Sequence, residues 1–207
     1  MALVKYNNNS ISNVTELASV PTGSLTHIKT LTASSSSTIS FVDGSNDVVL
    51  DNTYLVYMFK LINIHIASDT QKFQFNFSID GGSNYNVSKT TTMFNAVHDE
   101  GDSFASVAYD DNDDISGTGF QSMSGTGLGT VDDENLCATM FLFNPSSTTF
   151  VKHYILRSIQ NSAVNYPYDS YSGGYGNTTS AVNAIQFKSL SGNIDSGTFK
   201  LYGIKHS

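Results

Sequence analysis

The stretch Lys72–Ile79 constrains the fold more than any other part of the sequence, because its large and polar residues alternate strictly. Four large side chains occupy every second position: Phe73, Phe75, Phe77 and Ile79. A period of two places all four on one face of a half-buried β-strand. We therefore expect them to point into a core between two sheets. The strand should stop at Asp80-Gly81-Gly82, which predicts a turn.

Nine further segments have the residue types of strands. They are Leu25–Thr32, Thr38–Val42, Tyr54–Ile66, Tyr85–Phe94, Phe104–Tyr109, Leu136–Phe143, Phe150–Ile159, Val182–Lys188 and Thr198–Ile204. Tyr54–Ile66 is apolar on nearly both faces, which indicates a central strand. The Gly/Asn/Asp-rich stretch Leu190–Gly197 predicts a hairpin connection between the last two strands, and long loops are expected at 97–120, 121–134 and 160–180. The pattern predicts an all-β fold, a jelly-roll-like antiparallel β-sandwich of about eight to ten strands.

The composition agrees with this fold class and argues against several functions. Ser, Thr and Asn make up one third of the chain, whereas Glu occurs three times and Arg once, so strong helix formers are scarce. The net charge is −8, and the 10 basic residues are scattered along the sequence. Nucleic-acid binding needs clustered Lys and Arg, so we expect no nucleic-acid partner. An acidic chain is weakly attracted to anionic membranes, and its best apolar run is too short and too polar for membrane insertion.

Residues 1–23 differ from the rest and predict an N-terminal arm, followed by a single β-sandwich domain over residues 24–207. The arm is polar, and its apolar side chains are spaced like anchors rather than along one helix face: Leu3, Val4, Ile11, Val14, Leu17 and Val20. Such a segment becomes ordered when it packs against a neighbour, so these six are the candidate attachment residues. The arm lacks the apolar run of about 7–15 residues that a signal peptide needs, so we expect a protein made in a cytoplasm.

Motifs for catalysis or for a cofactor are missing from the sequence. Cys137 is the only cysteine and lies in an apolar run, which predicts a buried, inert thiol. The histidines form no closely spaced metal-binding pair, and His27, His65 and His153 fall within predicted strands, where a structural role is expected. Gly125–Gly129 lacks the strand-to-helix context of a phosphate loop, so a flexible loop is expected. We therefore expect neither a cofactor nor a catalytic residue.

Three acidic segments, at 98–102, 110–114 and 132–134, raise the question of calcium. The middle one supplies the first ligands of a helix-flanked calcium loop, but Ile115 stands where that loop requires glycine and Gln121 where it requires glutamate. Solvated acidic loops are expected, and a looser calcium site stays open. A glycosidase would place two carboxylates about 5–10 Å apart, a distance that a sequence does not give. With Glu so rare, we expect no enzyme.

The stretch Tyr166–Gly176 combines Tyr, Ser, Gly and Asp, the residue types of recognition loops. Its candidate surface recognition residues are Tyr166, Tyr168, Tyr171 and Tyr175, because aromatic rings can stack on sugar rings. The alternative is a Gly/Ser-rich connection whose tyrosines cover the end of the sandwich or a subunit interface.

Four stretches carry a resemblance to known proteins: Gly23–Phe41, Tyr54–His65, Phe75–Tyr85 and Ser191–Ile204. They resemble a group of tailed-bacteriophage virion proteins of the marine and cyanophage type. The resemblance spans most of the chain and lies in strands and turns. It implies a β-sandwich component of the particle, variously a capsid decoration, head-fibre or tail-fibre protein. The resemblance identifies no ligand-binding residue in this chain.

Together these features predict a non-enzymatic virion protein that assembles on the capsid or tail through its N-terminal arm. Its partners would be other virion proteins and further copies of itself, since symmetric oligomers are the default for such parts; a trimer is one of the open sizes. The alternative is a receptor-recognition module that binds a host surface glycan through the tyrosines. A third interpretation, a glycosidase acting on host polysaccharide, also stays open.

Overall fold

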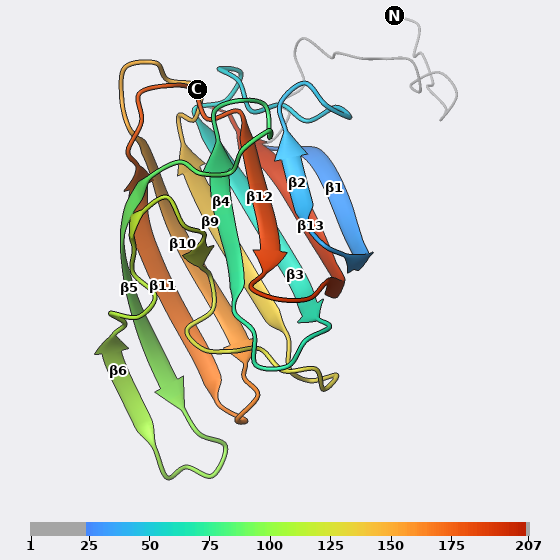
Figure 1. Ribbon diagram of the computed structural model, residues 1–207, viewed down its shortest axis with the longest axis vertical. Helices are drawn as coiled ribbons and strands as arrows, with labels where there is room; N and C mark the ends of the chain where they lie inside the picture. Colours follow the sequence, from blue (N-terminus) through green and yellow to red (C-terminus); the bar gives the residue numbers. More distant parts are fainter. Residues whose placement is uncertain (1–23, 206–207) are drawn as a thin grey trace, which may run out of the picture.

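The computed structural model describes residues 24–205, which form two antiparallel sheets packed face to face (Figure 1). In order across the larger sheet lie β1 (Leu25–Ser36), β13 (Ile194–Ile204), β3 (Val56–Ile66), β9 (Leu136–Phe143), β10 (Lys152–Asn161), β11 (Pro167–Gly176), β5 (Lys89–His98) and β6 (Ala105–Tyr109), with β7 (Ser116–Gly117) beside β5. The smaller sheet has the order β2 (Ile39–Val42), β12 (Ala184–Ser189), β4 (Phe73–Ser78) and β8 (Gln121–Ser122). The predicted all-β sandwich is confirmed.

The number of strands exceeds the prediction of eight to ten, since the described residues form 13. Two of the additional strands, β7 and β8, are only two residues long. The third is β11, which lies where a long loop was expected.

The core lies between the sheets and is built largely from aromatic rings. On β4, Phe73, Phe75 and Phe77 are fully buried, as the alternation predicted. The Phe75 ring makes an edge contact with Tyr154 from the opposite sheet, with the ring centroids 5.1 Å apart. Contacts of this kind lock the two sheets to each other.

The prediction that Ile79 also faces the core is wrong, because its side chain is 42% exposed. The strand ends one residue earlier, at Ser78. Ile79 therefore lies outside the strand, in the segment that leads into the turn where Gly81 and Gly82 adopt positive φ angles of 69° and 83°.

The polar face of β4 is covered as well. Asn76 is fully buried, and its amide nitrogen donates to the carbonyl oxygens of Tyr85 (2.7 Å) and Thr118 (2.9 Å). Lys89 is buried beside it and donates to Asn76 Oδ1 (2.5 Å) and to the carbonyl oxygen of Gly119 (2.8 Å). These bonds attach the segment around residue 118 to the strand, and burial lowers the pKa of Lys89 to about 7.

The central position predicted for β3 is confirmed, because this strand lies between β13 and β9. The predicted hairpin at Leu190–Gly197 is wrong. β12 belongs to the smaller sheet and β13 to the larger one, so the two strands do not pair. The turn instead carries the chain across the sandwich, and Ile194, fully buried, already belongs to β13.

The smaller sheet covers only part of the larger one. In Figure 1 it lies over one side of the larger sheet, and β6 extends beyond it. Two surfaces of the larger sheet are therefore candidates for a site: its outer face, and the inner face near β5 and β6.

Candidate functional site

The tyrosine-rich segment is a strand, and the loop predicted for residues 160–180 is wrong over Pro167–Gly176. β11 pairs with β10 on one side and with β5 on the other. Its small residues allow close packing: a Cβ on Gly174 would lie 2.6 Å from the carbonyl oxygen of Thr90. Glycine here permits a close approach of two strands, so the neighbouring tyrosines are held on a rigid sheet.

The four candidate tyrosines do not form one site. Tyr171 and Tyr175 alternate with buried serine and glycine residues and point outward from the sandwich. Tyr168 has the opposite strand parity and lines a groove on the inner side. Tyr166 precedes β11 and stacks on Phe104, with the ring centroids 6.2 Å apart.

The outer face of the larger sheet carries a continuous row of paired side chains, which we call the outer row. Its members are direct cross-strand partners on eight successive strands, from β1 to β6: Thr30, Lys200, Lys60, Thr139, Arg157, Tyr171, Phe94 and Tyr109. Neighbouring strands lie about 4.8 Å apart, so the row extends over roughly 34 Å. Its residues come from distant parts of the sequence, so only the sheet register brings them together.

The aromatic half of the outer row is a tight stack. The rings of Phe94 and Tyr171 are parallel within 3°, with centroids 4.9 Å apart. The guanidinium carbon of Arg157 lies 5.1 Å from the centroid of Tyr171. Both faces of the tyrosine are thus occupied within the protein, which argues against sugar stacking on Tyr171 itself. Phe94 is 45% exposed and offers the more accessible ring.

A bidentate ion pair holds Arg157 in place. Its Nε and Nη2 donate to the two carboxylate oxygens of Asp169 at 2.9 and 2.7 Å. These hydrogen bonds, together with the attraction between the two charges, raise the pKa of Arg157 and lower the pKa of Asp169. Both groups stay charged at neutral pH, so the middle of the outer row is fixed and polar.

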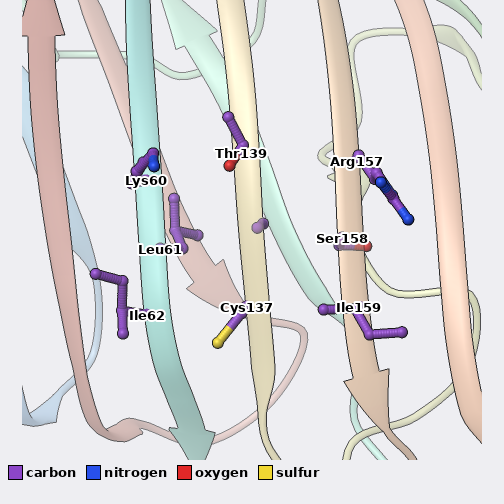
Figure 2. A pocket seen from close by; sticks show the side chains of 9 residues that line it. Lys60, Leu61, Ile62, Cys137, Thr139, Arg157, Ser158 and Ile159 are labelled. Carbon is purple, nitrogen blue, oxygen red and sulfur yellow. The ribbon is translucent and has the colours of Figure 1, made fainter.

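The cationic half of the outer row borders a hollow of about 440 Å³ between β3, β9 and β10. Figure 2 shows Thr139 and Cys137 on its central strand, with Lys60 on one side and Arg157 extending away on the other. The prediction of a buried thiol is wrong, because Cys137 is partly exposed here. Its sulfur accepts a bond from the backbone N–H of Asn63 at 3.3 Å.

A second depression, the inner groove, lies where β5, β6 and β11 extend past the smaller sheet. It has a volume of about 370 Å³ and is lined by Tyr168, Phe104, Asn95 and Asp110, among others. The amide nitrogen of Asn95 donates to Asp110 at 2.7 Å. The groove therefore combines aromatic rings with polar side chains, whereas most small-molecule sites are predominantly apolar.

The acidic segments are less exposed than predicted. Asp113 is buried and accepts from Lys72 Nζ at 2.5 Å, yet burial raises its pKa to about 6. Asp99 is buried as well and accepts the backbone N–H groups of Ser103 (2.8 Å) and Phe104 (2.6 Å). These carboxylates organise their loops and, with Glu134, are exceptions to the expected solvation. The other carboxylates of the three segments are exposed or partly exposed, as expected.

The glycine-rich stretch is packed rather than open. A Cβ on Gly127 would lie 2.7 Å from the backbone of Thr70, and one on Gly129 would lie 1.8 Å from the carboxylate of Glu134. Gly127 and Gly129 are both buried. The expectation of a flexible loop is therefore replaced by a segment that packs against the core, in which Leu128 is fully buried.

A third depression, of about 310 Å³, brings together two carboxylates that lie far apart in the sequence, Asp132 and Asp195. His65 lies between them, but its ring nitrogens already face partners: Asp195 at 3.4 Å and the carbonyl oxygen of Val131 at 3.3 Å. Over residues 24–205 there is no group of three or more His, Cys, Asp or Glu residues that could hold a metal ion. The same part of the chain contains no helix able to cross a membrane.

The six candidate attachment residues, from Leu3 to Val20, lie outside the described residues. The residues that the sequence reasoning missed are those of the outer row other than Tyr171. Phe94 and Tyr109 lay within predicted strands, but their pairing depends on a register that a single sequence does not reveal.

Comparison with known proteins gives little. No protein-family model and no curated protein matches the chain. Among solved structures, the chain is similar to one described as the CBM2 module of the evolved Dit protein of Lactobacillus casei BL23 phage J-1. The TM-score is 0.24 and the identity 14%, over 82% of this chain and 70% of the other. A likeness of this size establishes neither a shared fold nor a shared function.

Proposed function

We propose that the chain is a non-enzymatic structural protein of a bacteriophage particle, attached to the capsid or tail through residues 1–23 and assembled as a homo-oligomer. The observation that carries this proposal is the place of the resembling stretches in the fold. They form β1, nearly all of β3 and all of β13, which are adjacent in the larger sheet, and most of β2 and β4 in the smaller one. The likeness to virion proteins thus falls on the framework of the sandwich.

The outer face supports an assembly role as well. Ile62, Ile155 and Ile159 are between 38% and 53% exposed there. Exposed apolar side chains that share one face are typical of interaction surfaces. A particle component would cover such a face with a neighbouring subunit.

The test is deletion of residues 1–20. At about 25 cal/mol per Å² of apolar area, burial of a few arm side chains contributes several kcal/mol of attachment before ordering costs. The truncated protein should therefore fold, with the circular-dichroism spectrum and melting temperature of the full chain, but fail to join particles or the oligomer.

Two results would contradict the arm's role. Incorporation of the truncated protein at the level of the full chain would show that attachment lies elsewhere. Failure of the truncated protein to fold would show that the arm belongs to the core. Sedimentation with purified particles measures the first, and a thermal melt the second.

Glycan recognition is a second candidate function, and the outer row favours it. Aromatic, charged and hydroxyl side chains lie in one line on rigid strands, a geometry suited to an extended ligand. The test is a glycan array with the full chain and with Phe94→Ala. Loss of binding in this variant supports recognition at the outer row, whereas unchanged binding places any ligand elsewhere, for example in the inner groove.

A further inference from the structure

Two lysines on the outer face differ from the other cations of residues 24–205. Most of those cations have partners: Lys29 pairs with Asp47, Lys72 with Asp113 and Arg157 with Asp169, Lys89 and Lys152 donate to carbonyl oxygens, and Lys188 lies over the Phe120 ring. The side-chain ammonium groups of Lys60 and Lys200 make no ion pair or hydrogen bond with any residue that the structure describes. They are also direct cross-strand partners on β3 and β13.

This arrangement is unfavourable for folding by itself. Like charges placed directly opposite each other on neighbouring strands destabilise a sheet. The chain carries a net charge of −8, so acidic side chains that could have neutralised the pair are plentiful elsewhere. An anion from outside the chain, placed between the two ammonium groups, would relieve this repulsion.

The surroundings of the pair are suited to holding such an anion. Paired residues on adjacent antiparallel strands have Cα atoms about 4.5–5.5 Å apart, so two flexible ammonium groups can reach one anionic group. Thr139, the next member of the outer row, presents a hydroxyl beside Lys60. The hollow of about 440 Å³ next to Lys60 gives room for a bulky group and is bordered by Ile62 and Ile159.

We propose that Lys60 and Lys200 bind the sulfate or carboxylate groups of an acidic polysaccharide that lies along the outer row. This inference rests on the second candidate function, glycan recognition. Beyond the lysines the row continues through a hydroxyl, the Arg157–Asp169 pair and the exposed ring of Phe94. Hydroxyls and ring faces match the polar and apolar sides of sugars. Nucleic acid fits less well, because its binding depends on neutralising many phosphates.

The experiment is isothermal titration calorimetry with four probes and two double variants of the full chain. The probes are a sulfated galactan oligosaccharide, an uncharged galactan oligosaccharide of the same length, a polyuronate oligosaccharide and a single-stranded DNA of matched charge. The site variant is Lys60→Gln with Lys200→Gln. The matched control is Lys29→Gln with Lys188→Gln, which removes the same charge from other surroundings.

We expect at least one acidic oligosaccharide to bind the full chain, with an affinity that falls as salt is added, and the uncharged galactan to bind more weakly. The acidic probe that binds more tightly shows whether the site prefers sulfate or carboxylate groups. The site variant should lose about tenfold or more in affinity, since one hydrogen bond to a charged group contributes roughly that factor. The control variant should bind like the full chain. The site variant should also melt no lower than the full chain, because the repulsion is gone.

Three results would overturn the proposal: no binding of either acidic oligosaccharide, equal affinity for the uncharged galactan, or unchanged affinity in the site variant. Equal affinity for the DNA would overturn the assignment to a saccharide. The test separates the two functions. If Phe94→Ala abolishes oligosaccharide binding and the site variant does not, glycan recognition is supported and the anion site at Lys60 and Lys200 is refuted.

Discussion

Alanine substitutions at Phe75 and Ile79 should lower the free energy of unfolding by very different amounts, although both residues belong to the same alternating pattern in the sequence. Phe75 is fully buried, with its ring centroid 5.3 Å from Phe77 and 5.1 Å from Tyr154. Phe75→Ala removes a fully buried ring and leaves a cavity in the core, so it should lower the free energy of unfolding by about 3–5 kcal/mol. Ile79 is already 42% exposed, so Ile79→Ala should cost about 1 kcal/mol or less.

Equilibrium unfolding in urea measures the difference. A domain stability of about 10 kcal/mol, in the middle of the usual range, leaves the Phe75→Ala variant folded but weakened. With a slope of about 2 kcal/mol per molar urea, its midpoint should fall by about 2 M, and that of Ile79→Ala by about 0.5 M or less. Equal shifts in the two variants would refute the reasoning, because they would mean that Ile79 is part of the core after all.

Two further predictions concern buried polar and backbone features. The unfolding free energy should rise between about pH 7 and pH 10, because folded Lys89, whose pKa is lowered to about 7, releases its proton there while the unfolded chain keeps it. Lys89→Met should flatten this slope in urea titrations at several pH values, and an unchanged slope would rule out Lys89 as its source. Gly127→Ala should cost about 1–3 kcal/mol, because its Cβ would meet the backbone of Thr70 at 2.7 Å. Gly119→Ala is the control, because no atom lies within 4 Å of the added carbon, and it should leave the melting temperature nearly unchanged. An equal loss of stability in both variants would contradict the packed position of Gly127.

The sequence predicted the sandwich because local patterns determine it. The alternation from Phe73 to Phe77 indicates a strand with one face in a core. The apolar run of β3 indicates a strand in the middle of a sheet. The loop prediction for Tyr166–Gly176 was wrong because Ser and Gly usually indicate turns. In β11 these residues instead allow close strand packing, as at Gly174, and a single sequence does not distinguish the two uses.

The candidate site was less predictable because it is non-local. Lys60 and Lys200 lie 140 positions apart in the sequence and meet only through the pairing of β3 with β13. The same holds for Phe94 and Tyr171, which belong to different strands of the larger sheet. The hairpin expected between β12 and β13 failed for a related reason, because sheet membership depends on which partner strand is available rather than on the turn sequence.

The most direct test of the proposed virion role is quantitative mass spectrometry of gradient-purified particles from a phage-infected culture that produces the chain. A structural protein should be present in a fixed number of copies per particle that persists through repeated banding and matches the symmetry of the capsid or the tail. Abundant protein in the infected-cell lysate, together with its absence from the banded particles, would contradict the proposed virion role.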